Sequence, residues 1–173
     1  ERENVLPSDD DSVPNIRSGD YNVTDKADGQ RCLLVVMPSG GIYLMDMNLN
    51  VYGTDCRLSK AIAAEWAGCI LDGEWVRRNA ENKPMSNFYA FDIYNGQGGA
   101  DVSKLPFMVR SDKPAPSRYA AMNAAVAVLA QADRTVVGIP GHFSLHIATK
   151  NFRTPDDPTD PLGIFREAAA ILD

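Results

Sequence analysis

The amino-acid sequence predicts an α+β fold, in which strand hairpins outnumber strand–helix–strand units. Two apolar runs, residues 32–37 and 42–45, are separated by Pro-Ser-Gly-Gly, which is typical of a hairpin turn. Residues 117–131 are rich in alanine and predict a helix. Residues 143–148 alternate apolar and polar side chains, which indicates a strand. The 173 residues are enough for one domain with a hydrophobic core.

The N-terminal part of the chain differs in composition from the rest. The first 20 residues are rich in Asp, Ser, Pro and Asn, so we expect an extended or poorly ordered lead-in over residues 1–20. One domain is expected over residues 21–173. Helix formers occupy residues 58–67, and Gly68 predicts the end of that helix.

Later segments predict two more strands and a C-terminal helix. Residues 69–76 form a strand region around an Asp-Gly pair, and the aromatic and apolar residues 88–94 predict a buried strand. Asp160 and Pro161 are typical of an N-cap followed by proline at the first helical position. We expect that helix to run to Asp173.

Composition and charge exclude several classes of protein. The net charge is −6, whereas a stand-alone nucleic-acid binder is usually basic, so any positive surface is local or lies on another part of a longer polypeptide. Three cysteines without a C-x-x-C spacing predict neither a disulfide framework nor a zinc site, and they indicate a reducing compartment. No apolar run approaches the roughly 18 residues of a membrane span, so no membrane partner is expected.

The first candidate motif combines a lysine, an acid, a glycine and an arginine within residues 26–31. One interpretation is an Asp-Gly turn flanked by surface charges. The other is chemical. A lysine amine becomes a nucleophile when nearby cations lower its pKa, and glycine lets the backbone approach a phosphate. Arginine offers a fork of donors to ribose or phosphate oxygens.

Two further segments could take part in the same chemistry. The Asp72-Gly73-Glu74 run is either a tight turn or a carboxylate pair that holds a ribose hydroxyl or a hydrated Mg²⁺. The aromatic segment 88–94 is either core or a source of a base-stacking ring. Strand alternation places Asp92 on the face of Phe88 and opposite Phe91.

These motifs occur in the order K-x-D-G-x-R, D-G-E and F-D, and together they resemble the covalent nucleotidyltransferase superfamily. Its members include mRNA capping enzymes, ATP-dependent DNA ligases and RNA ligases. Residues 21–29 and 41–51 resemble the guanylyltransferase domain of large-DNA-virus capping enzymes. Many smaller capping enzymes carry Asp-Arg where Asp46 and Met47 stand. The resemblance implies antiparallel sheets with flanking helices, and a nucleotide in a groove between sheets near Lys26.

The resemblance also implies a role for each motif residue. Lys26 would bond covalently to the nucleotide phosphorus. The other residues would shape the loop (Asp28 and Gly29), contact the ribose (Arg31), bind ribose or metal-bound water (Glu74, supported by Asp72), stack on the base (Phe91) and lie near the triphosphate or metal (Asp92). Asp72, Glu74 and Asp92 are therefore the expected metal-site residues.

The implied reaction transfers GMP from GTP to the 5′-diphosphate end of RNA through a lysine–GMP intermediate. Mg²⁺ or Mn²⁺ is expected as cofactor, because both steps need charge neutralisation. Flanking triphosphatase and methyltransferase domains are expected partners. A cytoplasmic location is expected, in a viral factory or virion if the chain is viral.

Other features of the superfamily are missing from the sequence. After Gly73 there is no acid-Gly motif and no K-x-K motif, and no OB-fold domain follows. We therefore expect a fragment that reacts weakly or not at all with GTP by itself. Two alternatives remain: the adenylation domain of an ATP-dependent DNA or RNA ligase, and a non-catalytic binding module with the same fold.

Overall fold

The computed structural model divides the chain into two compact units. The larger unit covers Ala27–Thr149, and the smaller combines Glu1–Lys26 with Lys150–Asp173. The predicted lead-in over residues 1–20 lies outside the described residues. In the described parts of the chain, no helix is long and apolar enough to cross a membrane. The structure describes residues 21–109, 115–134, 145–155, 157, 160 and 162–172.

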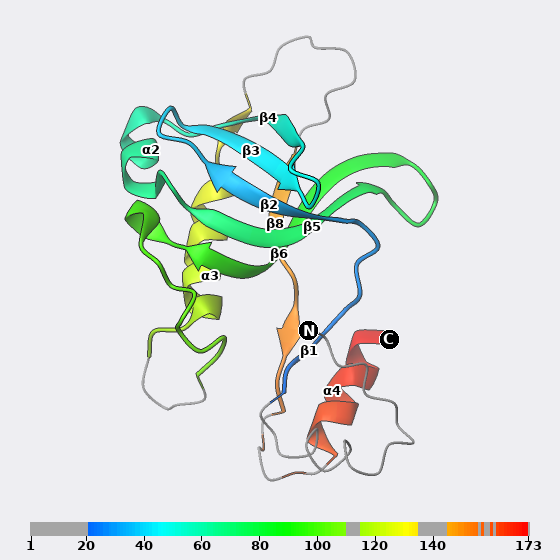
Figure 1. Ribbon diagram of the computed structural model, residues 1–173. Helices are drawn as coiled ribbons and strands as arrows, with labels where there is room; N and C mark the ends of the chain where they lie inside the picture. The colour runs from blue at the N-terminus through cyan, green and yellow to red at the C-terminus, as the bar shows by residue number, and fades with distance from the viewer. Residues whose placement is uncertain are drawn as a thin grey trace. The chain divides into compact units, whose positions relative to one another are not determined.

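A seven-stranded sheet forms the larger unit (Figure 1). Its strand order is β7-β4-β3-β2-β5-β6-β8. The sheet is mixed, because β8 runs parallel to β6 while all other neighbours are antiparallel. The sheet was expected to be antiparallel, and the pairing of β8 with β6 corrects this at one edge. The strands are β2 (Gln30–Val36), β3 (Gly41–Asp46), β4 (Val51–Arg57), β5 (Ile70–Arg78), β6 (Pro84–Asn95), β7 (Asp133–Arg134) and β8 (His146–Thr149).

The helix α3 (Arg118–Leu129) explains the parallel pair. It follows β6 in the chain and packs against it, and it leads to β7 at the opposite edge of the sheet. The chain then returns to form β8 beside β6. Ser117 caps the helix, because its side chain accepts a hydrogen bond from the backbone N–H of Ala120. The predicted helix over 117–131 is thus confirmed, with its ends shortened by one or two residues.

Two short helices lie at one side of the sheet. In α2 (Lys60–Trp66), the N-cap Ser59 accepts a hydrogen bond from the N–H of Ile62. Gly68 follows the helix with a positive φ of 81°, a conformation that glycine adopts without strain, so it ends the helix as predicted. The 3-10 helix η1 (Gln97–Gly99) follows β6 and contacts α2.

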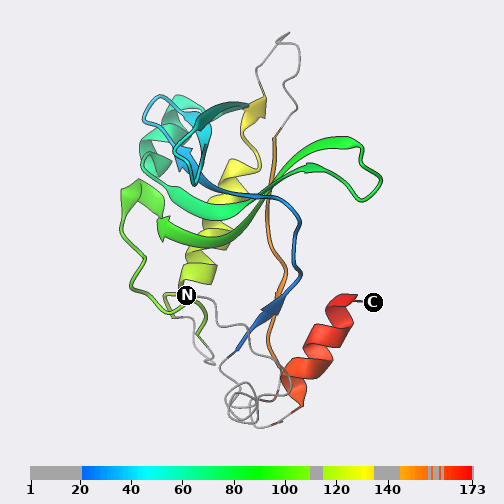
Figure 2. The same cartoon turned by 45° about the vertical axis from the view of Figure 1, so that its right-hand side comes forward.

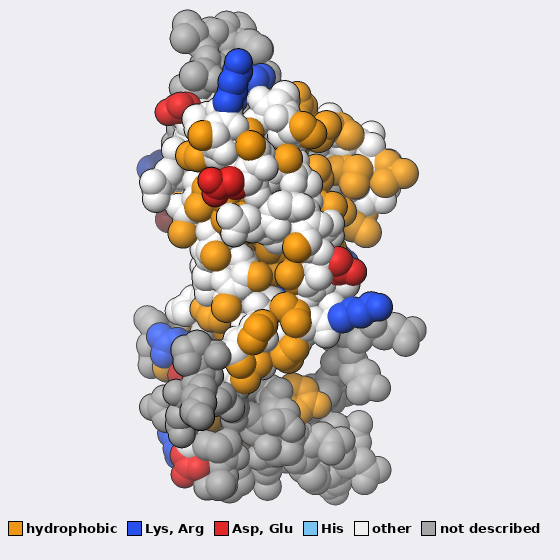
Figure 3. All heavy atoms as spheres, turned by 90° about the vertical axis from the view of Figure 1, so that its left-hand side faces the viewer, with side chains coloured by type: hydrophobic (Ala, Val, Ile, Leu, Met, Phe, Trp, Pro, Cys, Tyr) orange, Lys and Arg blue, Asp and Glu red, His pale blue; other side chains and the backbone are white. Residues whose placement is uncertain are grey.

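The core lies between the sheet and α3. Alternate residues of β2 and β3 point into it, and their opposite neighbours are half-buried or exposed. Hydrophobic side chains therefore remain on the outer face, as the right-hand part of the view in Figure 3 shows. The largest fully buried apolar side chains are Leu34, Val36, Ile42, Leu44, Leu71, Phe88, Ile93, Met122 and Leu129.

The β5–β6 hairpin extends beyond its neighbours in the sheet (Figure 2). Its turn is closed at Asn79, whose side-chain oxygen accepts a hydrogen bond of 2.8 Å from the N–H of Lys83. Asn82 adopts a positive φ of 59° in this turn, a conformation that asparagine tolerates better than most residues. The hairpin therefore presents the ends of both strands beyond the core.

The smaller unit contains a two-stranded sheet and one helix. Strand β1 (Val23–Thr24) pairs antiparallel with β9 (Phe152–Arg153), and α4 (Gly163–Leu172) contacts β1. The helix begins at Gly163 rather than at the predicted Pro161, which lies outside the described residues. Asp160 still accepts a hydrogen bond from the N–H of Leu162, so it caps the turn that precedes the helix.

Candidate active site

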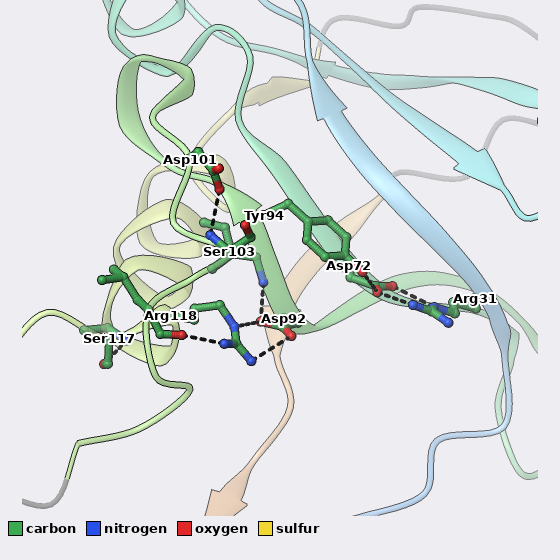
Figure 4. A network of polar contacts seen from close by, with 11 residues as sticks. Arg31, Asp72, Asp92, Tyr94, Asp101, Ser103, Ser117 and Arg118 are labelled. Atoms are coloured by element: carbon green, nitrogen blue, oxygen red, sulfur yellow. Dashed lines mark hydrogen bonds and ion pairs between the residues drawn. The ribbon is translucent and has the colours of Figure 1, made fainter. Parts of the chain in front are cut away.

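Arg31 and Asp72 form the centre of the candidate site (Figure 4). The Nε atom of Arg31 donates to Oδ1 of Asp72 at 3.0 Å, and Nη2 donates to Oδ2 at 2.6 Å. Asp72 is 1% exposed, whereas the Arg31 side chain is 49% exposed. The pairing raises the pKa of Arg31 well above its usual value, so the guanidinium stays charged. A buried carboxylate thus holds a cation whose other side faces solvent.

Tyr94 completes this cluster. Its hydroxyl donates to Oδ2 of Asp72 at 2.9 Å, so that oxygen accepts from both Tyr94 and Arg31. Burial and the hydrogen bond to Asp72 raise the pKa of Tyr94 above its usual value, because both disfavour a phenolate there. The Asp72 carboxylate is thereby fixed in one orientation, and it orients Arg31 in turn.

Glu74 links the first motif to the second. It is the register partner of Arg31 across β2 and β5, so both side chains point to the same face of the sheet. Its Oε1 atom accepts a hydrogen bond of 3.1 Å from the backbone N–H of Gly29. The loop that carries Asp28 and Gly29 is therefore tied to the D-G-E strand, and Asp28 itself is exposed at its tip.

The D-G-E run is not the tight turn that one interpretation of the sequence allowed. Asp72, Gly73 and Glu74 lie in the middle of β5, between β2 and β6. A Cβ atom on Gly73 would lie 2.3 Å from Cζ of Phe88, so glycine is needed for packing. Gly29 is similarly close to its neighbours, since a Cβ there would lie 2.8 Å from the carbonyl oxygen of Trp75.

Phe91 lies at a β-bulge beside Arg31. Asp72 pairs with Asp92, but Gly73 pairs with Ala90, so Phe91 is the extra residue on β6. Its ring centroid is 5.9 Å from Cζ of Arg31, within cation–π range. The predicted alternation therefore holds for Phe91 but is wrong for Asp92, because the bulge moves Asp92 to the face of its register partner Asp72.

Asp92 belongs to a second ion pair. Arg118, at the start of α3, donates from Nε to Oδ1 of Asp92 at 2.8 Å and from Nη2 to Oδ2 at 3.3 Å. It also donates from Nη1 to the carbonyl oxygen of Leu105. Although Asp72 and Asp92 are register partners, Figure 4 shows their carboxylates directed to different arginines. The second pair anchors α3 to the bulged strand.

Lys26 is joined to this cluster through the chain, as the last residue of the smaller unit. Its side chain is exposed. The backbone before it is fixed within the smaller unit, because Nζ of Lys150 donates to the carbonyl oxygen of Asp25 at 3.1 Å. Lys150 is 8% exposed, so a buried lysine holds the backbone next to Lys26 in place.

The carboxylates fit a metal site only if a ligand contributes. Both oxygens of Asp72 accept hydrogen bonds from Arg31 or Tyr94, and both oxygens of Asp92 accept from Arg118. Across the described residues, no cluster of three or more His, Cys, Asp or Glu side chains could hold a metal ion. Mg²⁺ is commonly held by one or two carboxylates together with substrate phosphates. These side chains could supply the carboxylates, and a bound nucleotide would supply the phosphates.

Three residues of this arrangement were missed in the sequence. Tyr94 lies in the recognised strand, and its partnership with Asp72 depends on the register of β5 and β6. Arg118 and Lys150 are far in sequence from the residues they bind. No spacing in the sequence signals either contact, because both depend on tertiary structure.

Comparison with known proteins identifies the family of this chain. The chain belongs to the family described as mRNA capping enzyme, catalytic domain, which matches residues 9–135 and so includes every motif residue. Over 95 residues the chain is 30% identical to a probable mRNA-capping enzyme of Acanthamoeba polyphaga mimivirus. The aligned part covers 55% of this chain but 7% of that protein, so the chain spans a small part of its relative.

Proposed function

We propose that this chain carries the nucleotide-binding part of an mRNA guanylyltransferase, which transfers GMP from GTP to the 5′-diphosphate end of RNA. The observation that carries the proposal is the convergence of the motifs. Arg31, Asp72, Glu74 and Phe91 come from three neighbouring strands and meet on one part of the sheet. Family membership supports the same reaction.

In the proposed first step, Nζ of Lys26 forms a bond to the α-phosphorus of GTP, and the bond to the bridging oxygen breaks as pyrophosphate leaves. In the second step, a terminal phosphate oxygen of the RNA diphosphate attacks the same phosphorus and releases the lysine. The covalent intermediate divides one difficult transfer into two easier steps. A bound Mg²⁺ or Mn²⁺ would neutralise charge on the phosphates in both.

The remaining residues would orient the nucleotide. The solvent-facing side of the Arg31 guanidinium is proposed to contact the ribose, with Phe91 beside it to stack on the base. Glu74 would contact the ribose or a metal-bound water from the same face. The ion pair with Arg31 favours a positioning role for Asp72, and the pair with Arg118 favours the same for Asp92.

The test is covalent labelling. The chain, and any longer chain that contains it, is incubated with α-labelled GTP or α-labelled ATP and Mg²⁺ or Mn²⁺, then denatured and separated on a gel. We expect label from GTP that Lys26→Ala abolishes, weak in the 173 residues alone because the K-x-K motif is absent from this sequence. Lys60→Ala, which changes an exposed lysine elsewhere, is the control.

Each alternative predicts a different result. Lys26-dependent label from ATP instead of GTP would assign the chain to the polynucleotide ligases. Absence of label from either nucleotide in the longer chain would favour a non-catalytic binding module. Efficient labelling of the 173 residues alone would contradict the expectation that they react weakly.

A further inference from the structure

A cavity of about 690 Å³ lies within the larger unit, away from the candidate active site. It is lined by the end of β5, the start of β6 and part of β4, so it lies beside the extended end of the β5–β6 hairpin. Four of its lining residues matter for its chemistry: Tyr52, Trp75, Arg77 and Arg78. Its volume is in the range of pockets that bind a small ligand or one unit of a polymer.

The cavity and the candidate active site are on opposite faces of the sheet. Glu74 points to the face of Arg31, its register partner, and Trp75 follows it in the strand, so Trp75 points the other way. Trp75 is instead the register partner of the buried Phe88. A ligand in the cavity therefore would not overlap with a nucleotide at Arg31.

Two aromatic rings are held in place in the cavity. The rings of Tyr52 and Trp75 lie 5.3 Å apart between centroids, at an angle of 55°. Nε1 of Trp75 donates to the Ser86 hydroxyl at 2.9 Å, and the Tyr52 hydroxyl donates to Oδ2 of Asp46 at 3.0 Å. Both rings are fixed at one end and only half-buried, which suits them to stack on a planar group.

The cavity is also positively charged. Both charged residues that line it, among the described residues, are arginines. Cζ of Arg77 lies 5.0 Å from the Trp75 ring centroid, and Arg78 is exposed beside it. The chain carries a net charge of −6, so this pair is a local cationic site on an acidic protein. Aromatic rings with adjacent cations are the usual means of holding single-stranded nucleic acid.

We propose that this cavity binds single-stranded RNA. A base would stack against Tyr52 or Trp75, and the neighbouring phosphates would contact Arg77 and Arg78. The inference rests on the proposed function, since it takes the RNA substrate as the ligand. The RNA would then lie on the face of the sheet opposite Arg31. It would be retained independently of the nucleotide.

The experiment measures binding of a short, fluorescent, 5′-diphosphate RNA by anisotropy at several salt concentrations. The double variant Arg77→Ala/Arg78→Ala is compared with the parent and with Arg57→Ala/Lys60→Ala, which removes two exposed charges elsewhere in the same unit. We expect the first variant to lose about tenfold in affinity. Its slope of log affinity against log salt should become shallower by about 1.4, or about 0.7 for each lost phosphate contact to a single strand.

A second measurement uses tryptophan fluorescence. The chain has two tryptophans, and Trp66 is buried while Trp75 is half-buried in the cavity. RNA should quench the emission through Trp75, and GTP should not compete. Equal RNA affinity in both double variants, no RNA binding by the parent, or displacement of RNA by GTP would each overturn the proposal.

The proposed cavity and the proposed reaction can fail separately. Normal Lys26-dependent labelling in Arg77→Ala/Arg78→Ala, with parental RNA affinity, would overturn the cavity proposal alone. Loss of RNA affinity in that variant, when even a longer chain that contains these residues never labels with GTP, would support an RNA-binding cavity and overturn the guanylyltransferase.

Discussion

The guanidinium of Arg31 meets the carboxylate of Asp72 through two hydrogen bonds, 2.6 and 3.0 Å long, on adjacent strands. Asp72 is buried and Arg31 reaches solvent, so the acid determines where the cation points. The hydroxyl of Tyr94 donates to Oδ2 of Asp72, the same oxygen that accepts from Nη2 of Arg31. The orientation of one exposed arginine therefore depends on two residues that need not touch a nucleotide.

Tyr94→Phe should weaken nucleotide use without abolishing it. The variant removes one hydrogen bond to a charged group and keeps the ring, so we expect a loss of about 1 kcal/mol in stability. If Arg31 contacts the ribose, the KM for GTP in the labelling reaction should rise while the rate at saturation changes little. A KM equal to that of the parent would argue against positioning through Asp72. Tyr43→Phe, on an exposed tyrosine, is the matched control.

Removal of the Arg118 side chain should loosen α3 from the sheet. Arg118→Ala breaks the pair with Asp92 and the hydrogen bond to the carbonyl oxygen of Leu105, and both partners are only partly exposed to solvent. We expect a decrease of about 2 kcal/mol in the free energy of unfolding, measured in urea. Arg57→Ala removes an exposed arginine and should change stability little; a similar loss in both variants would contradict a specific role for Arg118.

Gly73→Ala should destabilise the larger unit. The added Cβ would lie 2.3 Å from the Phe88 ring, which is fully buried, so the ring or the backbone would have to shift. Overpacking of this kind costs about 3 kcal/mol. Gly53→Ala in β4 is the control, since a Cβ there meets its nearest atom at 3.9 Å. The melting temperatures of the two variants, measured by circular dichroism, should differ clearly, and equal values would mean that Phe88 can shift.

Asp46 should make stability depend on pH in the acid range. Its hydrogen bonds with Asn50, with help from Tyr52 and Asn48, lower its pKa to about 2. An unfolded aspartate has a pKa of about 3.9, so the stabilisation is present above about pH 4 and is lost as pH falls towards 2. Urea unfolding of the parent and of Asp46→Asn should therefore converge in this window. A constant difference between them down to pH 2 would contradict this assignment.

The sequence predicted the existence of most elements, because their signals are local. The hairpin over 32–45, the capped helix after Ser117 and the stop at Gly68 each depend on residues close in the chain. The parallel pairing of β8 was not predictable in this way. It follows from where α3 leads the chain, which depends on packing across the whole sheet.

The candidate site likewise contains residues that the sequence predicted and residues that only the tertiary structure reveals. Motif order selected Arg31, Glu74 and Phe91, and the structure brings them together. The pairing of Asp72 with Arg31 and Tyr94 depends on strand register, which one sequence does not reveal. The bulge at Phe91 was not predictable either, so simple alternation placed Asp92 on the wrong face. One inserted residue reverses the faces of the residues that follow it.

The glycine in the middle of the D-G-E run is required by the ring of Phe88, and Gly29 is required by the backbone at Trp75. The glycine of each motif is therefore required by the packing of the sheet. A related protein that had lost the reaction but kept this sheet would still need both glycines, and so would still match part of both motifs. Under the proposed reaction, Lys26, Arg31 and Glu74 would distinguish a relative that is still an enzyme better than these glycines do.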